Sequence, residues 1–309
     1  MAEIQLSPAS MPSLSSSLPE VAARCIAVGP AACRAMGTWH SEMQVAQCFV
    51  STEPGQPTEQ GQSWVTLDAV EDSAAALQDS ADAVADKVLA WLRTSLSECT
   101  GLVVDTSTRA ARITGLTLAR RLQAAGIDVL AVVLSARLHQ GAEAIQQSRH
   151  AHAQLHELCN ASMLIDGARF APLDDPAPYV QHVCDTLLQA VNEYGHINVD
   201  VQDIFSALCG RNSHMAHAVV QRGPRLAQDL LEQLEQLTQG RLMTVAELRC
   251  ARAALVLVDA AHGQLKLSDA RDIMQTISSM MLPDVHFIYG SGYSQRPEAE
   301  LGITLLISY

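Results

Sequence analysis

The segment "GLVVDTSTRAARITGLTLARRLQAAGIDVLAVVLS" (residues 101–135) contains a strand, a polar loop, a helix and a second strand. The apolar residues within 99–108 predict a buried strand that runs into the loop. Apolar residues at helical spacing continue to Gly126, which ends the predicted helix. A continuous apolar run then fills 127–135. Two apolar strands joined by a helix indicate a parallel pair that is buried on both faces.

The same alternation of strands and helices recurs on both sides of this segment. Further strands are expected within 24–29, 42–52 and 162–167, and helices after residue 30 and at 72–96, 141–158 and 179–195. Asp72 and Ser73 are candidate N-caps of the helix at 72–96. The pattern predicts an α/β fold, a Rossmann-type parallel sheet with helices on both faces.

The last third of the chain has a different order of elements. A helix is predicted at 223–237, a strand at 251–260, a helix within 265–281 and two closing strands at 285–293 and 301–309. We therefore expect a flexible tail (1–20), rich in Ser and Pro, and an α/β domain that includes a long central helix (21–195). A connecting loop and helix (196–222) lead to a smaller C-terminal α+β domain (223–309).

The composition excludes several classes of partner. Of the 309 residues, 48% are hydrophobic and 17% are charged, which predicts a large buried core. The formal net charge is −13, and no run of Lys or Arg occurs, so we expect no nucleic acid and no anionic membrane as a partner. Aromatic residues make up only 4%, which also argues against stacking on bases.

The cysteines and apolar runs indicate a cytoplasmic protein. None of the eight cysteines forms a C-x-x-C pair, so we expect no metal site, and most read as small buried hydrophobes in a reducing compartment. The N-terminus has no signal-peptide pattern. No apolar run reaches the roughly 20 residues of a membrane span, so no direct membrane insertion is expected.

In this order, the elements resemble the FtsZ/tubulin superfamily, and FtsZ in particular, over roughly residues 22–309. "HINVDVQDIFSAL" (196–208) is similar to the FtsZ segment after the central helix, where N-x-D-x-x-D is matched by Asn198, Asp200 and Asp203. Residues 251–277 resemble the first strand and helix of the second FtsZ domain, and 283–309 resemble its terminal hairpin. Residues 101–135 fit the strand, phosphate loop, helix and strand of the nucleotide site.

The resemblance implies a tubulin/FtsZ-like fold and a GTPase that stacks head to tail. In that family, the two acids of one subunit reach the nucleotide of its neighbour and orient the attacking water. Phosphoryl transfer needs such positioning more than covalent help from the protein. Asp200 and Asp203 are also well placed to cap a helix, so capping remains an alternative for them.

The nucleotide-binding half departs from the family pattern. Only Gly29 remains of the first glycine loop, where Pro30 has no N–H to donate and Arg34 ends the segment. The hallmark loop G-G-G-T-G-T-G becomes "DTSTRAARITGL" (105–116), which retains Thr114 and Gly115. We expect that GTP binding and hydrolysis are lost, although Arg34, Arg109 and Arg112 could attract an anion near the helix ends.

Two other motifs favour structural roles. His150, His152 and His156 are predicted to lie on a solvated helix face, because no H-E-x-x-H pattern accompanies them. "YGSGYSQ" (289–295) is Gly-rich but lies between strands, and is predicted to be a hairpin turn rather than a phosphate loop.

These observations predict a degenerate FtsZ-like protein without a cofactor, which associates with itself as a dimer or filament that does not need GTP. One alternative is a regulator or cap of genuine FtsZ filaments, with FtsZ as the partner. The other is a GTPase with a rebuilt pocket lined by Arg109 and Arg112. The chain stops at Tyr309, so the C-terminal peptide by which FtsZ recruits membrane-anchored partners is not expected.

Overall fold

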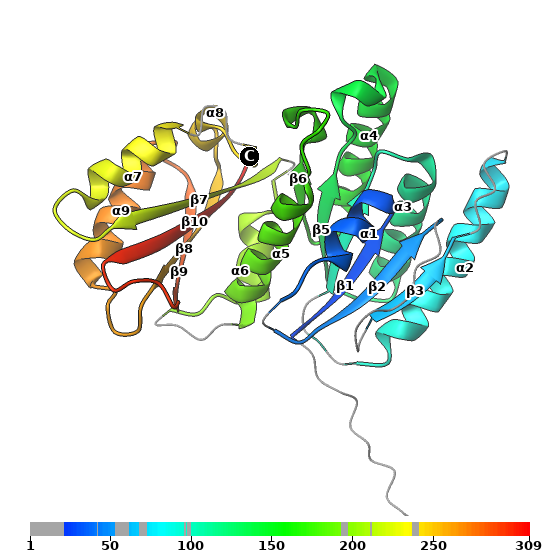
Figure 1. The fold of residues 1–309 in the computed structure, drawn as a ribbon, viewed down its shortest axis with the longest axis horizontal. Helices are drawn as coiled ribbons and strands as arrows, with labels where there is room; N and C mark the ends of the chain where they lie inside the picture. The colour runs from blue at the N-terminus through cyan, green and yellow to red at the C-terminus, as the bar shows by residue number, and fades with distance from the viewer. Residues whose placement is uncertain are drawn as a thin grey trace, which may run out of the picture.

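The computed structural model describes residues 22–41, 43–52, 62–67, 73–95, 97, 100–192, 197–210, 212–236 and 241–309. The predicted tail, His196, Asp72 and most of the predicted loop at 53–63 lie outside the described residues. The described part contains a six-stranded sheet and a four-stranded sheet, with helices α5 (Ala177–Asn192) and α6 (Val201–Ala207) between them (Figure 1).

The six-stranded sheet is parallel throughout, as the sequence predicts. Its strand order is β3-β2-β1-β4-β5-β6. The strands are β1 (Ala23–Val28), β2 (Val45–Ser51), β3 (Gln62–Thr66), β4 (Thr100–Asp105), β5 (Val129–Leu134) and β6 (Ala161–Ile165). The four central strands are almost wholly buried, which explains their continuous apolar runs.

Helices cover both faces of this sheet. α1 (Pro30–Gly37) and α5 pack on one face. α2 (Ala74–Leu92), α3 (Arg109–Ala124) and α4 (Ala142–Leu158) pack on the other. The hydroxyl of Ser73 accepts a hydrogen bond from the backbone N–H of Ala76 and so caps α2, as predicted. Short 3-10 turns η1 (Leu138–Gln140) and η2 (Gly167–Arg169) follow β5 and β6.

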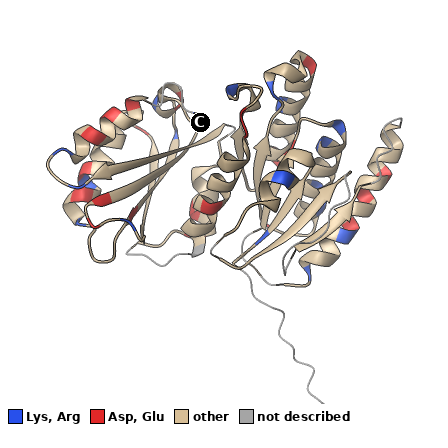
Figure 2. Ribbon diagram, in the orientation of Figure 1, with Lys and Arg blue, Asp and Glu red and all other residues tan. Residues whose placement is uncertain are grey.

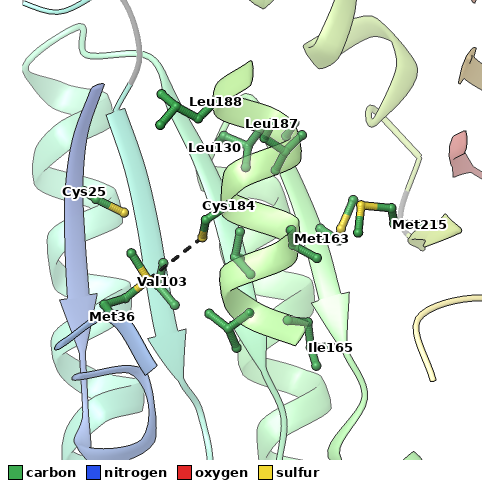
Figure 3. Packing of buried hydrophobic residues seen from close by; sticks show 14 of the residues in the cluster. Cys25, Met36, Val103, Leu130, Met163, Ile165, Cys184, Leu187, Leu188 and Met215 are labelled. Atoms are coloured by element: carbon green, nitrogen blue, oxygen red, sulfur yellow. Dashed lines mark hydrogen bonds between the residues drawn. The ribbon is translucent and has the colours of Figure 1, made fainter. Parts of the chain in front are cut away.

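α5 connects the cores of the two sheets. Its buried Cys184, Leu187 and Leu188 point toward the first sheet, and the Cys184 thiol lies 4.0 Å from the sulfur of Met36 in α1 (Figure 3). At the far side of α5, the side chains of Met163 on β6 and Met215 on the second sheet point toward each other (Figure 3). The buried apolar surface is therefore continuous from one sheet to the other.

The second sheet has the strand order β7-β10-β8-β9. It is formed by β7 (Ser213–Gln221), β8 (Ala253–Ala260), β9 (His286–Tyr293) and β10 (Glu300–Ser308). Helices α7 (Leu226–Glu235), α8 (Val245–Arg249) and α9 (Leu267–Ser279) pack with it. β10 is antiparallel to both β7 and β8, whereas β8 and β9 are parallel.

The terminal hairpin expected at 283–309 is wrong. β8 lies between β9 and β10, and Tyr289–Tyr293 belongs to β9 rather than to a turn. The physical reason is the burial of β10, in which every residue after Glu300 is buried. Such a strand needs a neighbour on each side to satisfy its backbone N–H and C=O groups, so it occupies an interior position in the sheet.

An ionic cluster joins the two parts of the molecule. Arg169, after β6, pairs with Glu247 of α8, and His214 Nε2 on β7 lies 3.3 Å from the same carboxylate. The hydroxyl of Thr244 donates to the other carboxylate oxygen at 2.9 Å. Burial raises the pKa of Glu247, but the Arg169 hydrogen bond and the positive charges outweigh it, so the net shift is downward.

Candidate functional site

The candidate site lies at the carboxyl ends of β1 and β4, where the strand order of the sheet reverses direction. Open α/β sheets bind ligands in the crevice outside such a switch point. A cavity of about 380 Å³ opens here, with Arg109 at its edge. Its other lining residues are Val28, Gly29, Pro30, Val50, Ser51, Thr52, Leu67, Leu77, Thr108, Ala110 and Ala111.

Gly29 is required by the local geometry of this crevice. Its φ of 92° lies in the region that favours glycine. A Cβ at this position would lie 2.7 Å from the Cβ of Ala111 and 3.1 Å from the Cβ of Asp105. Close packing of the two loops therefore explains the glycine without a ligand.

The side chain of Asp105, at the end of β4, lies at the N-terminal end of α1. Its side chain is buried, with only 2% of the residue exposed. One carboxylate oxygen accepts a hydrogen bond of 3.0 Å from the backbone N–H of Ala31, and the other accepts one of 3.0 Å from the N–H of Ser107. Helix N-termini bind anions through such N–H groups. Here the anion is a side chain of the protein itself.

Asp105 cannot be recognised as a site residue from the sequence pattern alone. The available signal was a single carboxylate at the end of a buried strand, directly before the loop that replaces the glycine-rich one. Its hydrogen-bond partner lies 74 positions away in the sequence, so only the tertiary structure reveals the contact.

The three candidate arginines have different surroundings. Arg109, the first residue of α3, is exposed and lines the cavity. Arg112 instead donates to the carbonyl oxygens of Thr106 at 3.0 Å and Ser107 at 3.3 Å, and also bonds Gln147. Burial and the charge of Arg109 lower the pKa of Arg112. Arg34 is exposed on α1 and does not line the cavity.

The structure does not bring Thr114 and Gly115 to the cavity. Both are buried inside α3, which begins at Arg109 and is capped by the hydroxyl of Thr108. A Cβ on Gly115 would lie 2.6 Å from Cγ1 of Val104. The glycine therefore allows α3 to pack closely on β4.

The two acids of the N-x-D-x-x-D motif cap α6. The Asp200 carboxylate accepts a 2.8 Å hydrogen bond from the N–H of Asp203, and the Asp203 carboxylate accepts a 3.1 Å bond from the N–H of Asp200. This reciprocal arrangement is a capping box. In the described part of the chain, no Lys or Arg forms an ion pair with either carboxylate.

The acids and the cavity lie at opposite ends of the α/β part. α5 follows the carboxyl end of β6 and runs back along the sheet before α6 begins. Its 16 residues span about 24 Å. Within one copy the carboxylates therefore cannot reach the cavity, and a site that used both would need two copies.

The prediction for the histidines of α4 is wrong for His152. Its side chain is buried, and its Nε2 lies 3.4 Å from the Ser162 hydroxyl, which His156 Nδ1 contacts at 3.0 Å. Burial, and then the charge of His156, lower the pKa of His152 to about 4. α4 packs on the sheet through the face that carries Ser148, His152 and Leu155, whereas His150 is exposed.

Two classes of site find no support in the described ranges of the chain. There, no group of three or more His, Cys, Asp or Glu side chains is placed to hold a metal ion. None of the helices described has the length and apolar character needed to cross a bilayer.

Comparison with known proteins finds relatives mainly through structure. No family model matches the chain. A mitochondrial division protein, fszA of Dictyostelium discoideum, is 29% identical over 114 residues, which is 37% of this chain and 21% of that protein. An empty FtsZ dimer from M. jannaschii superimposes with a TM-score of 0.72 and 15% identity, over 95% of this chain and 89% of that one.

A protofilament of CetZ2 from Haloferax volcanii with bound GTPγS gives a TM-score of 0.66 and 16% identity, over 93% of this chain and 92% of that one. At these identities, the likeness is one of fold. The chain has the fold of the FtsZ/tubulin superfamily, with a parallel sheet domain, a long central helix and a second, smaller sheet domain.

Proposed function

We propose that this protein is an FtsZ-like assembly protein that no longer binds or hydrolyses GTP and that acts through contacts between its own copies. The observation that carries the proposal is the position of the Asp105 carboxylate at the start of α1. It already accepts the N–H of Ala31, and Pro30 before it has no N–H to offer.

A nucleotide phosphate at this position would meet a carboxylate of the same sign. To bind there, the phosphate would have to displace the buried Asp105 carboxylate from its hydrogen bonds. The free-energy cost of that displacement exceeds the free energy that a phosphate contact at the surface would supply. The cavity beside it is lined mainly by apolar side chains, with Arg109 as the cationic group at its edge. These features argue against the alternative of a GTPase with a rebuilt pocket.

Self-association is supported by the solved relatives. One of them is an FtsZ dimer without nucleotide, and another is a CetZ2 protofilament. The separation of the acids of α6 from the cavity also fits a function that needs two copies.

A second candidate function is a cap or regulator of genuine FtsZ filaments. The N-x-D-x-x-D motif is retained at one end, while the nucleotide end is altered. A copy of this chain could then join one end of a filament and offer no nucleotide site for the next subunit.

The nucleotide content of the purified protein tests the main proposal. The protein is denatured and the supernatant is analysed by chromatography, while sedimentation velocity is recorded with and without GTP. We expect no guanine nucleotide and the same association state under both conditions. Stoichiometric bound nucleotide, or association that needs GTP, would contradict the proposal. Co-pelleting with an FtsZ that hydrolyses GTP tests the second candidate, which predicts altered polymer mass.

A further inference from the structure

Two histidines meet where α5 contacts the second sheet. The ring of His182, on α5, stands edge to face against the ring of His217, on β7, with 5.5 Å between the ring centroids. Both side chains are half-buried. On β7, His217 lies between the buried Met215 and the exposed Val219, which share its face of the strand. The two histidines therefore lie at the rim of the junction between the two parts of the molecule, where water can reach them.

An ion pair on the second sheet accompanies these histidines. Figure 2 shows Lys, Arg, Asp and Glu mainly on helices and loops, and Asp259 on β8 is one of the few exceptions within a strand. Its carboxylate accepts a 2.5 Å hydrogen bond from Nε of Arg296, in the loop between β9 and β10. A Cβ on Gly302 of β10 would collide with this carboxylate and would lie 2.6 Å from Arg296 Nε. The glycine therefore leaves room for the ion pair to lie flat against β10.

Arg296 fixes the protonation state of His217. A guanidinium can only donate hydrogen bonds, and one of its NH₂ groups lies 3.1 Å from Nε2 of His217. Nε2 must therefore be the unprotonated nitrogen of a neutral ring. Nδ1 then carries the hydrogen, which it donates to Oγ1 of Thr304 at 2.9 Å. A proton that arrives at Nε2 would face a donor, so the charged ring loses its hydrogen bond with Arg296.

Protonation would place more positive charge at this rim than the neighbouring carboxylates can balance. His182, His217 and Arg296 would then form a group of three cations. In the described part of the chain, the carboxylates that face them are already engaged. Asp259 pairs with Arg296. Asp185, one turn after His182 on α5, accepts a 2.7 Å hydrogen bond from an indole N–H.

The pKa values of the two histidines follow this balance of charge. Burial lowers the pKa of His182, and the charge of Asp185 opposes that effect. Burial, then the charges of His182 and Arg296, lower the pKa of His217, against the charge of Asp259. Both rings therefore resist a proton as long as the junction is closed.

We infer that His182 and His217 act as an acid-sensitive latch between α5 and the second sheet. Above pH 6.5 both rings are neutral and the junction is closed. As the pH falls below 6.5, opening becomes favourable, because it returns each ring to water and separates it from the other cations. Acid therefore separates the second sheet from α5 at this rim, while each sheet keeps its own core. The inference does not depend on the proposed function.

Methionines at the junction report whether it is open. Met163 of β6 and Met215 of β7 are each 1% exposed and point toward each other (Figure 3). Met36 of α1 is equally buried but lies beside Cys184, within the first part of the molecule. Dilute hydrogen peroxide transfers an oxygen atom to an accessible thioether and leaves as water. Peptide mass spectrometry at pH 7.5 and pH 5 measures the sulfoxide at each position.

We expect the two junction methionines to be oxidised roughly tenfold faster at pH 5 than at pH 7.5, and Met36 to change little. The double variant His182→Gln with His217→Gln should lose this acid response, because its side chains cannot take up a proton. His150→Gln, on the exposed face of α4, is the matched control and should keep the response. His182→Arg places a permanent cation at the rim, so the junction methionines should react already at pH 7.5. Circular dichroism checks that every variant is folded.

NMR spectra of the histidine rings test the tautomer directly. Neutral His217 should carry its proton on Nδ1, and Arg296→Met should raise its titration midpoint by about one pH unit, because a neighbouring cation is removed. A neutral ring with the proton on Nε2 would overturn the inference. So would an acid response that survives in the double variant, or one in which Met36 is oxidised as fast as the junction methionines, since the latter is global unfolding.

Discussion

The carboxylate of Asp105 accepts a hydrogen bond of 3.0 Å from the backbone N–H of Ala31, the second residue of α1. The two residues belong to loops that follow β4 and β1, at the point where the sheet order reverses. In a fold that binds anions at such a point, this contact supplies the negative charge from within the chain. The contact also fixes the two loops against each other.

We predict that Asp105→Asn destabilises the protein by about 1.5–3 kcal/mol. The amide keeps one oxygen acceptor but turns its NH₂ group toward one of the two backbone N–H donors, which loses its partner in a buried position. Urea unfolding followed by circular dichroism measures the change. Asp79→Asn, on the exposed surface of α2, is the control and should stay within about 0.5 kcal/mol. Equal stability of the two variants would contradict the role given to Asp105.

The interior strands of the fold could be predicted from the sequence, but two of its edge strands, β3 and β7, could not. Interior strands such as β4 and β5 are buried on both faces, so they appear as continuous apolar runs. β3 and β7 lie at sheet edges. β3 has two apolar residues in five, and β7 contains two histidines and a serine, so neither carries that signal. The pairing of β10 with β7 and β8 depends on contacts between residues far apart in sequence.

For the candidate site, the sequence could predict only that the glycine-rich nucleotide loops of the family are missing. The sequence shows directly that the glycines of the first loop are replaced and that Pro30 lacks a donor. It does not show that the Asp105 carboxylate lies where the glycine loop would bind phosphate, because its donor, the N–H of Ala31, comes from a distant part of the sequence. Thr114 and Gly115 match a motif by spacing, but the helix begins early enough to bury both of them.

We predict that Gly115→Ala destabilises the protein by about 1–3 kcal/mol, because the new methyl group meets Val104 at 2.6 Å. Adding Val104→Ala should recover part of the lost stability, because the smaller side chain makes room for the new methyl group. No such recovery is expected if Gly115 is needed to bind a ligand. Gly37→Ala, at the end of α1, is the matched control, since a Cβ there meets nothing within 4 Å. Thermal melting of the three variants measures the effect, and a neutral Gly115→Ala would contradict the packing role.

We predict that His152 makes stability fall as the solution is acidified. Its pKa is about 4 in the folded protein and about 6.5 when unfolded, so the unfolded chain binds one more proton between these values. The contribution is fully present above pH 6.5 and declines as pH falls toward 4, by about 3 kcal/mol in all. Urea midpoints between pH 7 and pH 4 measure it.

The control for this pH dependence is His152→Gln, which removes the titrating group. Its stability should fall less steeply with pH than that of the wild type. His182, His214 and His217 also have lowered pKa values through burial, so part of the slope remains. An unchanged slope would show that His152 does not contribute.

We predict that Glu247→Gln destabilises the protein by about 3 kcal/mol, because it leaves the partly buried guanidinium of Arg169 without its carboxylate. The exposed pair of Arg121 and Asp86 is the matched control, and Asp86→Asn should cost less than about 1 kcal/mol. Since Arg169 and Glu247 belong to different parts of the molecule, losing the pair should also let the two sheets unfold less cooperatively. Chemical unfolding followed by circular dichroism, with the slope compared between variants, measures both effects. A cost no larger than that of the exposed pair would mean that packing across α5, and not this cluster, holds the two parts together.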